Sequence, residues 1–137
     1  MKILERYVAK KPLISIVDDD ASVREGTVDL IQAIGFAAEA FVGASDFLSS
    51  NRIESTACLI ADVRMPGMTG LELHERLVGA GKIIPTILLT AYPNGRDRER
   101  ALRAGVICYL AKPYNQDDLL ACIRSALEFR WRDCRRC

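Results

Sequence analysis

The sequence predicts a single α/β domain, in which a five-stranded parallel sheet is covered by five helices on its two faces. Short runs rich in β-branched residues alternate with longer segments of helical period. Most of the short runs are apolar throughout, as central strands of a parallel sheet require, and right-handed crossovers join consecutive parallel strands. The expected strands are residues 13–17, 36–41, 57–61, 85–89 and 106–110.

Helical period and stop signals place one helix after each strand. The first follows Asp20 and ends at Gly35, and a second, short helix covers residues 45–50. The third begins after the loop 64–70, and the fourth holds residues 96–104 and stops at Gly105. The fifth starts near Asn115 and carries an apolar stripe made of Leu119, Leu120, Ile123, Ala126 and Leu127.

The length of 137 residues and the composition fit one ordinary globular domain. We place it at residues 13–129, with residues 1–12 as an N-terminal extension and residues 130–137 as a C-terminal tail or the start of a linker. A formal net charge of +1 gives no global field that would draw the chain to nucleic acid or anionic lipid. No apolar run has the length of a signal-peptide core or of a membrane span, so we expect a cytoplasmic location and no membrane partner.

The five cysteines are odd in number and irregular in spacing, which argues against a disulfide framework. Cys58 and Cys108 lie in apolar runs, where a free cysteine behaves as a small hydrophobic residue. Cys134 and Cys137 form a C-x-x-C pair in an arginine-rich tail, with no second pair and no nearby histidine. The sequence does not define a role for this pair.

Polar side chains stand at the carboxyl ends of four of the expected strands. Asp18 and Asp19 follow the first strand, Asp62 the third, Thr90 the fourth and Lys112 the fifth. In an open doubly wound sheet these ends meet at one edge, where ligands bind. Any one of these residues could simply cap the next helix. Helix capping alone does not explain why three carboxylates, a hydroxyl and an ammonium stand at the same edge of the sheet.

Three carboxylates in one pocket repel one another and need a cation, and a site made only of oxygen ligands selects Mg²⁺. Asp62, in the middle strand, is the expected nucleophile, because an aspartate can form an acyl phosphate. We expect Asp19 to bind the metal directly and Asp18 to bind it through water. Lys112 would pair with one phosphoryl oxygen, and Thr90 would donate a hydrogen bond to another.

The motifs around these residues resemble those of the receiver domains of bacterial response regulators. They are residues 16–20 (IVDDD), 62–70 (DVRMPGMTG), 89–91 (LTA) and 109–113 (YLAKP), in the order and at the spacing of that family. The resemblance covers roughly residues 13–129, and the loop after Asp62 is most similar to that of the nitrogen-fixation and nodulation regulators. It implies a flavodoxin-like fold of the chemotaxis-receiver type, with strand order 2-1-3-4-5.

The resemblance also implies a role in a phosphorelay. Asp62 would accept a phosphoryl group from a sensor histidine kinase, and the backbone carbonyl of Arg64 would complete the Mg²⁺ site with Asp19 and Asp62. Phosphorylation would draw the Thr90 hydroxyl toward the phosphoryl group and let Tyr109 rotate inward. That change repacks the surface of the fourth helix, fifth strand and fifth helix, where family members dimerise or meet partners.

The family implies that the output is a partner or a transcriptional domain, with no catalysis beyond Mg²⁺-dependent self-phosphorylation and autodephosphorylation. Regulators of this branch usually carry a helix-turn-helix domain after the receiver, and the sequence contains no such DNA reader. We therefore expect contact with DNA only through an output domain outside this chain. The chain is then either a stand-alone receiver or the amino-terminal piece of a longer regulator. The family also implies a cis peptide bond between Lys112 and Pro113.

Arg64 lies two residues after Asp62, and Tyr92 lies two residues after Thr90. Both side chains could overhang the phosphoryl group and hinder the attacking water. We therefore expect a phosphorylated form that decays over many minutes or longer.

Three rival interpretations are weaker. A phosphohydrolase of the haloacid dehalogenase type also uses a strand-end aspartate and Mg²⁺, but it needs a second aspartate where Arg64 stands. A nucleotide-binding protein would carry a glycine-rich phosphate fingerprint, and neither common form occurs. A degenerate receiver that acts only as a protein-binding module is the remaining alternative, although it would not need the complete set of acidic, hydroxyl and lysine residues.

Overall fold

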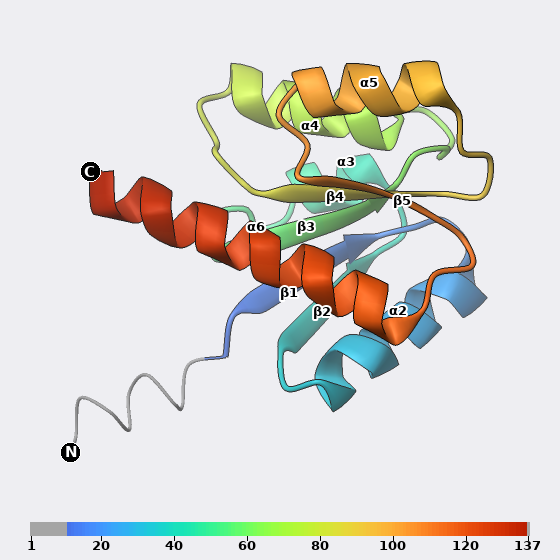
Figure 1. Cartoon of the computed structure of the whole chain (residues 1–137), viewed down its shortest axis with the longest axis horizontal. Coiled ribbons are helices and arrows are strands. Elements are labelled where there is room, and N and C mark those ends of the chain that lie inside the picture. The colour runs from blue at the N-terminus through green and yellow to red at the C-terminus, as the bar shows by residue number, and fades with distance from the viewer. Residues whose placement is uncertain (1–10, 137) are drawn as a thin grey trace.

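The computed structural model describes residues 11–136, with side chains up to residue 129. Its five strands form one parallel sheet in the order β2-β1-β3-β4-β5 (Figure 1). The predicted fold class and strand order are confirmed. The strands are β1 (Leu13–Val17), β2 (Ala37–Phe41), β3 (Thr56–Asp62), β4 (Thr86–Thr90) and β5 (Cys108–Ala111), and the helices of the described residues are α2 (Ala21–Ala33), α3 (Ala44–Leu48), α4 (Gly70–Gly79), α5 (Gly95–Arg103) and α6 (Gln116–Arg136).

Helices cover both faces of the sheet and divide the apolar core into two layers. Figure 1 shows α3, α4 and α5 on one face and α2 and α6 on the other. Successive residues of the central strand β3 point to opposite faces. Leu59 and Ala61 pack on the α3–α5 side, and Cys58 and Ile60 pack on the α2 and α6 side. All residues of β3 are buried, which explains why its sequence is a continuous apolar run up to Asp62.

Side chains cap several of the helices that follow the strand ends, α2 and α4 among them. Asp20 accepts hydrogen bonds from two backbone N–H groups in the first turn of α2. Thr69 and Glu72 form a reciprocal capping box at the start of α4. Asp20, the third aspartate of the first motif, is therefore a helix cap. Asp18 and Asp19 are the two aspartates of this motif that lie at the strand-end pocket.

A buried histidine links three elements on the α4 side of the sheet. The His74 ring is 5% exposed and lies 2.9 Å from the Thr86 hydroxyl of β4. Its other ring nitrogen lies 2.9 Å from the carbonyl oxygen of Ala104, which follows α5. These contacts offset the desolvation of a buried polar ring and fix α4 and α5 relative to β4.

The last strand and the last helix differ in extent from the sequence-based expectation. β5 begins at Cys108 rather than at Val106, because the backbone N–H of Val106 bonds to the Ala101 carbonyl and closes the C-terminal turn of α5. Helix α6 continues past residue 129 to Arg136. The domain boundary at residue 129 and the linker role of residues 130–137 stay predictions. Most of the N-terminal extension, and the side chains of Cys134 and Cys137, lie outside the described residues.

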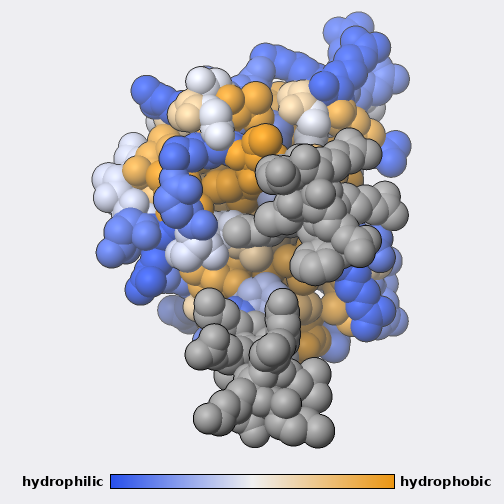
Figure 2. Space-filling model, turned by 90° about the vertical axis from the view of Figure 1, so that its left-hand side faces the viewer, coloured by the Kyte–Doolittle hydropathy of each residue, from blue (hydrophilic) through white to orange (hydrophobic). Residues whose placement is uncertain are grey.

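The surface carries interspersed apolar and hydrophilic residues. Figure 2 shows this for the end of the domain where the strands begin, away from their carboxyl ends. None of the helices in the described part of the chain combines the length and the apolar character that a membrane crossing requires. The largest exposed apolar side chains of the described residues are those of Val42, Val78, Ile83, Tyr92, Leu102 and Phe129.

Candidate functional site

Four adjacent strands bring the predicted site residues to one edge of the sheet. Asp18 follows β1, Asp62 ends β3, Thr90 ends β4 and Lys112 follows β5. Asp18, Asp62 and Thr90 are buried, Lys112 is half-buried and Asp19 is exposed. The residues that the strand pattern places at one edge therefore do meet there, with Asp19 on the solvent side.

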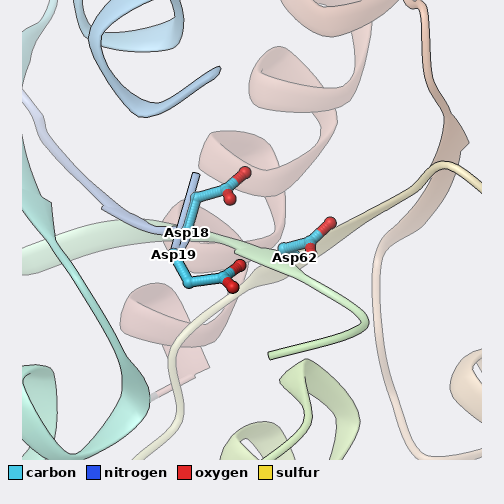
Figure 3. A group of neighbouring side chains, drawn as sticks. All are labelled: Asp18, Asp19 and Asp62. Carbon is cyan, nitrogen blue, oxygen red and sulfur yellow. The ribbon is translucent and has the colours of Figure 1, made fainter. Parts of the chain in front are cut away.

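The carboxylates of Asp18, Asp19 and Asp62 share one space. One carboxylate oxygen from each lies within 4.8 Å of those of the other two. Figure 3 shows the three side chains turned toward one another, two from the end of β1 and one from the end of β3. Oxygen ligands at this spacing fit a hard divalent cation such as Mg²⁺, which uses one or two carboxylates and keeps several waters. The donor set is therefore chemically suited to the metal that the sequence predicts.

Backbone hydrogen bonds hold Asp18 in place. Its N–H donates to the Phe41 carbonyl of β2 at 3.1 Å, and its carboxylate Oδ1 accepts from the Asp20 N–H at 2.9 Å. The Arg24 guanidinium of α2 donates to the Asp18 carbonyl at 2.7 Å. With both backbone groups and one carboxylate oxygen engaged, the second carboxylate oxygen has a fixed direction toward the pocket.

The Lys112 ammonium bridges two of the three carboxylates. Its Nζ lies 2.9 Å from Asp62 Oδ1 and 3.3 Å from Asp18 Oδ2. Burial alone would lower the pKa of Lys112, but the hydrogen bond to Asp62 and the charges of Asp18 and Asp62 outweigh burial and raise that pKa. The Lys112–Pro113 peptide bond is cis, as the family resemblance implies. One ammonium faces three carboxylates, so the pocket keeps an excess of negative charge.

The pKa of Asp62 is raised above its ordinary value. Burial is the largest cause, because it disfavours the charged form, and the charges of Asp18 and Asp19 act in the same direction. The hydrogen bond and the charge of Lys112 oppose the shift without cancelling it. A further cation in the pocket would therefore stabilise the ionised form of Asp62.

Removing the charge of Asp62 is expected to stabilise the protein in the absence of divalent ions. Because the folded-state pKa is raised, ionisation of Asp62 costs the folded state free energy as the pH rises through that pKa. We expect Asp62→Asn to raise the free energy of unfolding at neutral to alkaline pH, measured by urea titration. The difference should shrink as the pH falls toward the ordinary range of an aspartate. Equal free energies of unfolding for the wild type and Asp62→Asn at alkaline pH would contradict this expectation.

Gly70, the first residue of α4, lies against the backbone of Asp62. A Cβ at this position would lie 2.5 Å from the Asp62 carbonyl oxygen and 2.9 Å from Leu88 Cδ2. The Gly70 N–H also donates to the Val63 carbonyl at 3.1 Å. Only a residue without a side chain lets α4 approach β3 this closely. We did not expect a site role for Gly70; a glycine directly after a capping threonine, where helix propensity disfavours it, was the available signal.

The loops after Asp62 and Thr90 are joined by a contact between Arg64 and Tyr92. The guanidinium carbon lies 4.9 Å from the ring centroid, a cation–π geometry between two exposed side chains. The buried Thr90 hydroxyl accepts a hydrogen bond from the Tyr92 N–H at 3.0 Å. Within residues 11–136, the Arg64 carbonyl takes part in no hydrogen bond, so it is free to act as a ligand.

Tyr109 lies on β5 with its ring on the α3–α5 side of the sheet. Its hydroxyl is buried and has no hydrogen-bond partner among the described residues. A pocket of about 200 Å³ adjoins it, with Arg64, Asp97 and Arg100 among its other lining residues. An unpaired buried hydroxyl costs about 1–3 kcal/mol. The adjoining pocket therefore gives the Tyr109 side chain room for a second position, and the cost of its unpaired hydroxyl favours such a move.

The chain belongs to the family of response regulator receiver domains, which matches residues 14–124. The predicted family is confirmed by this match. The chain is therefore a receiver domain of two-component signalling, the class of module that couples a sensor to a response.

Curated relatives agree with this assignment. Response regulator protein TodT of Pseudomonas putida is 37% identical over 116 residues, which cover 85% of this chain and 51% of TodT. Nodulation protein W of Bradyrhizobium diazoefficiens is 32% identical, covering 86% of this chain and 52% of that protein. Transcriptional regulatory protein FixJ of the same organism is 33% identical, covering 83% and 56%. The predicted likeness to the nitrogen-fixation and nodulation branch is confirmed, and the chain spans about half the length of these relatives.

A solved structure supports the same conclusion. The response regulator StyR superimposes with a TM-score of 0.84 at 40% sequence identity, covering 92% of this chain and 64% of that chain. The fold and the family are thus supported by both sequence and three-dimensional similarity.

Proposed function

We propose that Asp62 accepts a phosphoryl group from the phosphohistidine of a sensor kinase. In this proposal Asp19, Asp62 and the Arg64 carbonyl bind Mg²⁺, and Asp18 acts through water. The observation that carries it is the Lys112 bridge, in which one ammonium contacts Asp62 and Asp18 beside a third carboxylate. A salt bridge whose only role was stability would pair one ammonium with one carboxylate. Here a single ammonium faces three carboxylates, so the pocket keeps two negative charges in excess.

Each side chain has one task in the transfer. A carboxylate oxygen of Asp62 attacks the phosphorus, the P–N bond to the kinase histidine breaks, and the histidine nitrogen keeps the electron pair. Lys112 would neutralise one phosphoryl oxygen, and the Thr90 hydroxyl would donate a hydrogen bond to another. Mg²⁺, when bound, would offset the negative charge on the phosphoryl oxygens.

Chemical trapping tests which residue takes the phosphoryl group. The protein would be incubated with acetyl phosphate and Mg²⁺ and reduced with borohydride, which converts an aspartyl phosphate to homoserine, and its peptides would then be sequenced by mass spectrometry. We expect conversion at Asp62 and at no other aspartate. Conversion at Asp18 or Asp19 would overturn the assignment, and no conversion in a folded protein would overturn the phosphorylation itself.

We infer that phosphorylation changes the surface formed by α5, β5 and α6, the fourth helix, fifth strand and fifth helix of the sequence-based prediction. The Thr90 hydroxyl now accepts a hydrogen bond from the Tyr92 N–H, and turning it so that it donates to a phosphoryl oxygen would strain that bond. The segment after Thr90 would then move, and Tyr109 with its unpaired hydroxyl would repack. A second copy of the chain or an output domain would bind this surface. Any contact with DNA would be made by such an output domain, in keeping with relatives that are transcriptional regulators.

The phosphorylated form is expected to last many minutes, because the paired Arg64 and Tyr92 side chains would restrict the approach of water. We expect Tyr92→Ala to speed the loss of the phosphoryl group about 2- to 5-fold, which corresponds to the roughly 0.5–1 kcal/mol of an exposed cation–π contact. Decay would be followed by intact mass after removal of the phosphodonor. Leu102→Ala, an exposed position on α5, is the control and should leave the decay rate unchanged. Decay of the wild type within seconds would refute the expected lifetime.

A further inference from the structure

A tyrosine that follows the Lys112–Pro113 pair is tied to α2 by a hydrogen bond between two side chains. The Tyr114 hydroxyl lies 2.7 Å from the Thr27 hydroxyl, although 87 positions separate the two in the sequence. Figure 1 shows the start of α6, just after Tyr114, beside α2. Tyr114 is half-buried against the apolar core on the α2 and α6 side, and Thr27 is buried. The contact therefore joins α2 to the segment that carries Lys112.

The direction of this hydrogen bond follows from the number of available hydrogens. A threonine hydroxyl has one hydrogen, and that of Thr27 is donated to the Val23 carbonyl one turn earlier, at 2.8 Å. The Thr27 oxygen therefore accepts, and the Tyr114 hydroxyl is the donor. A phenylalanine would fill the same apolar space, so the hydroxyl adds a specific link between two elements and not only packing.

On one side, the link is connected to Lys112 through a short and restrained piece of backbone. Only Pro113 separates Tyr114 from Lys112, and its ring fixes one of the backbone torsions between them. The Lys112 N–H donates to the Thr90 carbonyl at 2.7 Å. Lys112 is therefore held between an anchor on β4 and an anchor on α2.

On the other side, α2 is connected to the carboxylates. Arg24, three residues before Thr27, donates to the Asp18 carbonyl at 2.7 Å, and the Asp20 side chain caps the start of the same helix. Asp18 Oδ2 in turn lies 3.3 Å from Lys112 Nζ. The hydroxyl link and this ion pair both join the β1–α2 segment to the segment after β5, so the first supports the geometry of the second.

We propose that Tyr114 is a positioning residue: its hydrogen bond to Thr27 sets how the Lys112 ammonium lies between the two carboxylates that it contacts. Without the link, the Lys112 side chain would sample more orientations and spend less time in contact with both carboxylates. The consequence for phosphoryl transfer rests on the proposed function, in which Lys112 neutralises a phosphoryl oxygen. The positioning itself does not, since it can be measured with no metal and no phosphoryl group present.

Side-chain NMR relaxation of the full chain tests the positioning. The ε-methylene signal of Lys112 would be assigned from its loss in Lys112→Arg, and its motion would be measured without Mg²⁺ and without a phosphodonor. We expect Tyr114→Phe, which removes only the hydroxyl, to increase the fast motion of this group. Lys82, which pairs with Glu54 on the exposed surface, is the internal control and should be unaffected in the same spectra.

Substitutions of Thr27 separate the link from a local effect at Tyr114. Thr27→Val keeps the size of the side chain but removes the acceptor, so it should loosen Lys112 as much as Tyr114→Phe does. Thr27→Ser keeps a hydroxyl and should leave the motion of Lys112 as in the wild type. Circular dichroism would confirm that each variant is folded. Unchanged Lys112 motion in Tyr114→Phe, or a change there that Thr27→Val does not reproduce, would overturn the proposal.

The same variants test the consequence for the reaction. With saturating acetyl phosphate and Mg²⁺, Tyr114→Phe and Thr27→Val should take up the phosphoryl group about 3- to 10-fold more slowly than the wild type, well below the roughly 100-fold that a misplacement of about 1 Å can cost. Thr27→Ser should react at the wild-type rate.

A Lys112→Ala background distinguishes positioning from general support of the fold. There, Tyr114→Phe should slow the reaction no further, because the group that it positions is gone. Equal slowing with and without Lys112 would contradict the proposal. A wild type that takes up no phosphoryl group would refute the proposed function instead, and the NMR comparison would still decide whether Tyr114 positions Lys112.

Discussion

Replacing Asp19 by asparagine is expected to slow phosphorylation by acetyl phosphate about 100-fold, the usual scale for removing one preorganised group on which transition-state stabilisation depends, here a ligand of the proposed Mg²⁺. Asp19 is the exposed member of the three-carboxylate cluster, so it contributes charge and a metal ligand without supporting the core. Because a metal ligand is lost, a higher Mg²⁺ concentration should be needed to reach half of the maximal rate. The urea midpoint in the absence of divalent ions should not fall.

Asp20→Asn is the matched control for this experiment. Asp20 is the next residue and is also exposed, but its side chain caps α2 through two backbone N–H groups. Asparagine caps a helix about as well as aspartate. We expect Asp20→Asn to be phosphorylated at nearly the wild-type rate. If both variants lost activity equally, general electrostatics rather than a metal site would explain the effect of Asp19.

Replacing Gly70 by alanine is expected to lower the free energy of unfolding by about 2–3 kcal/mol. The new methyl group would lie 2.5 Å from the Asp62 carbonyl oxygen, and a backbone atom cannot rotate away as a side chain can. Relief requires α4 to move away from β3. Since β3 ends in Asp62, that movement should also reduce phosphorylation. Urea titration and the rate of phosphoryl uptake would measure the two effects.

Gly26→Ala serves as the control for Gly70→Ala. Gly26 lies within α2, and a Cβ there would meet nothing within 4 Å. Alanine has the better helix propensity, so this variant should gain about 0.5–1 kcal/mol. A Gly70→Ala protein as stable as Gly26→Ala would show that α4 does not press against β3 as closely as the structure indicates.

The residues at the strand ends could be predicted because parallel topology fixes where strand ends go. Once the apolar runs before Asp18, Asp62 and Thr90 are recognised as parallel strands, their carboxyl ends must lie at one edge. Lys112 follows by the same reasoning from the fifth run. The Lys112 contacts with Asp18 and Asp62, at 3.3 and 2.9 Å, are a consequence of this topology.

Other features depend on distances between elements, which a sequence pattern does not contain. The close approach of Gly70 to Asp62 depends on how far α4 sits from β3, and the His74 bridge depends on the rotation of α4 about its axis. Hydrophobic period identifies the buried face of a helix, but it does not identify which side chain on the next element each residue will meet.

The most direct test of the central claim is the intact mass of the protein after incubation with acetyl phosphate. Wild type, Asp62→Asn and a metal-free wild-type sample would be compared under the same conditions. We expect the wild type to gain one phosphoryl group, roughly 80 Da, only when Mg²⁺ is present, and we expect no gain in Asp62→Asn. A folded wild type that gains no mass, or an Asp62→Asn protein that gains as much as the wild type, would contradict the claim that Asp62 is the phosphoryl acceptor.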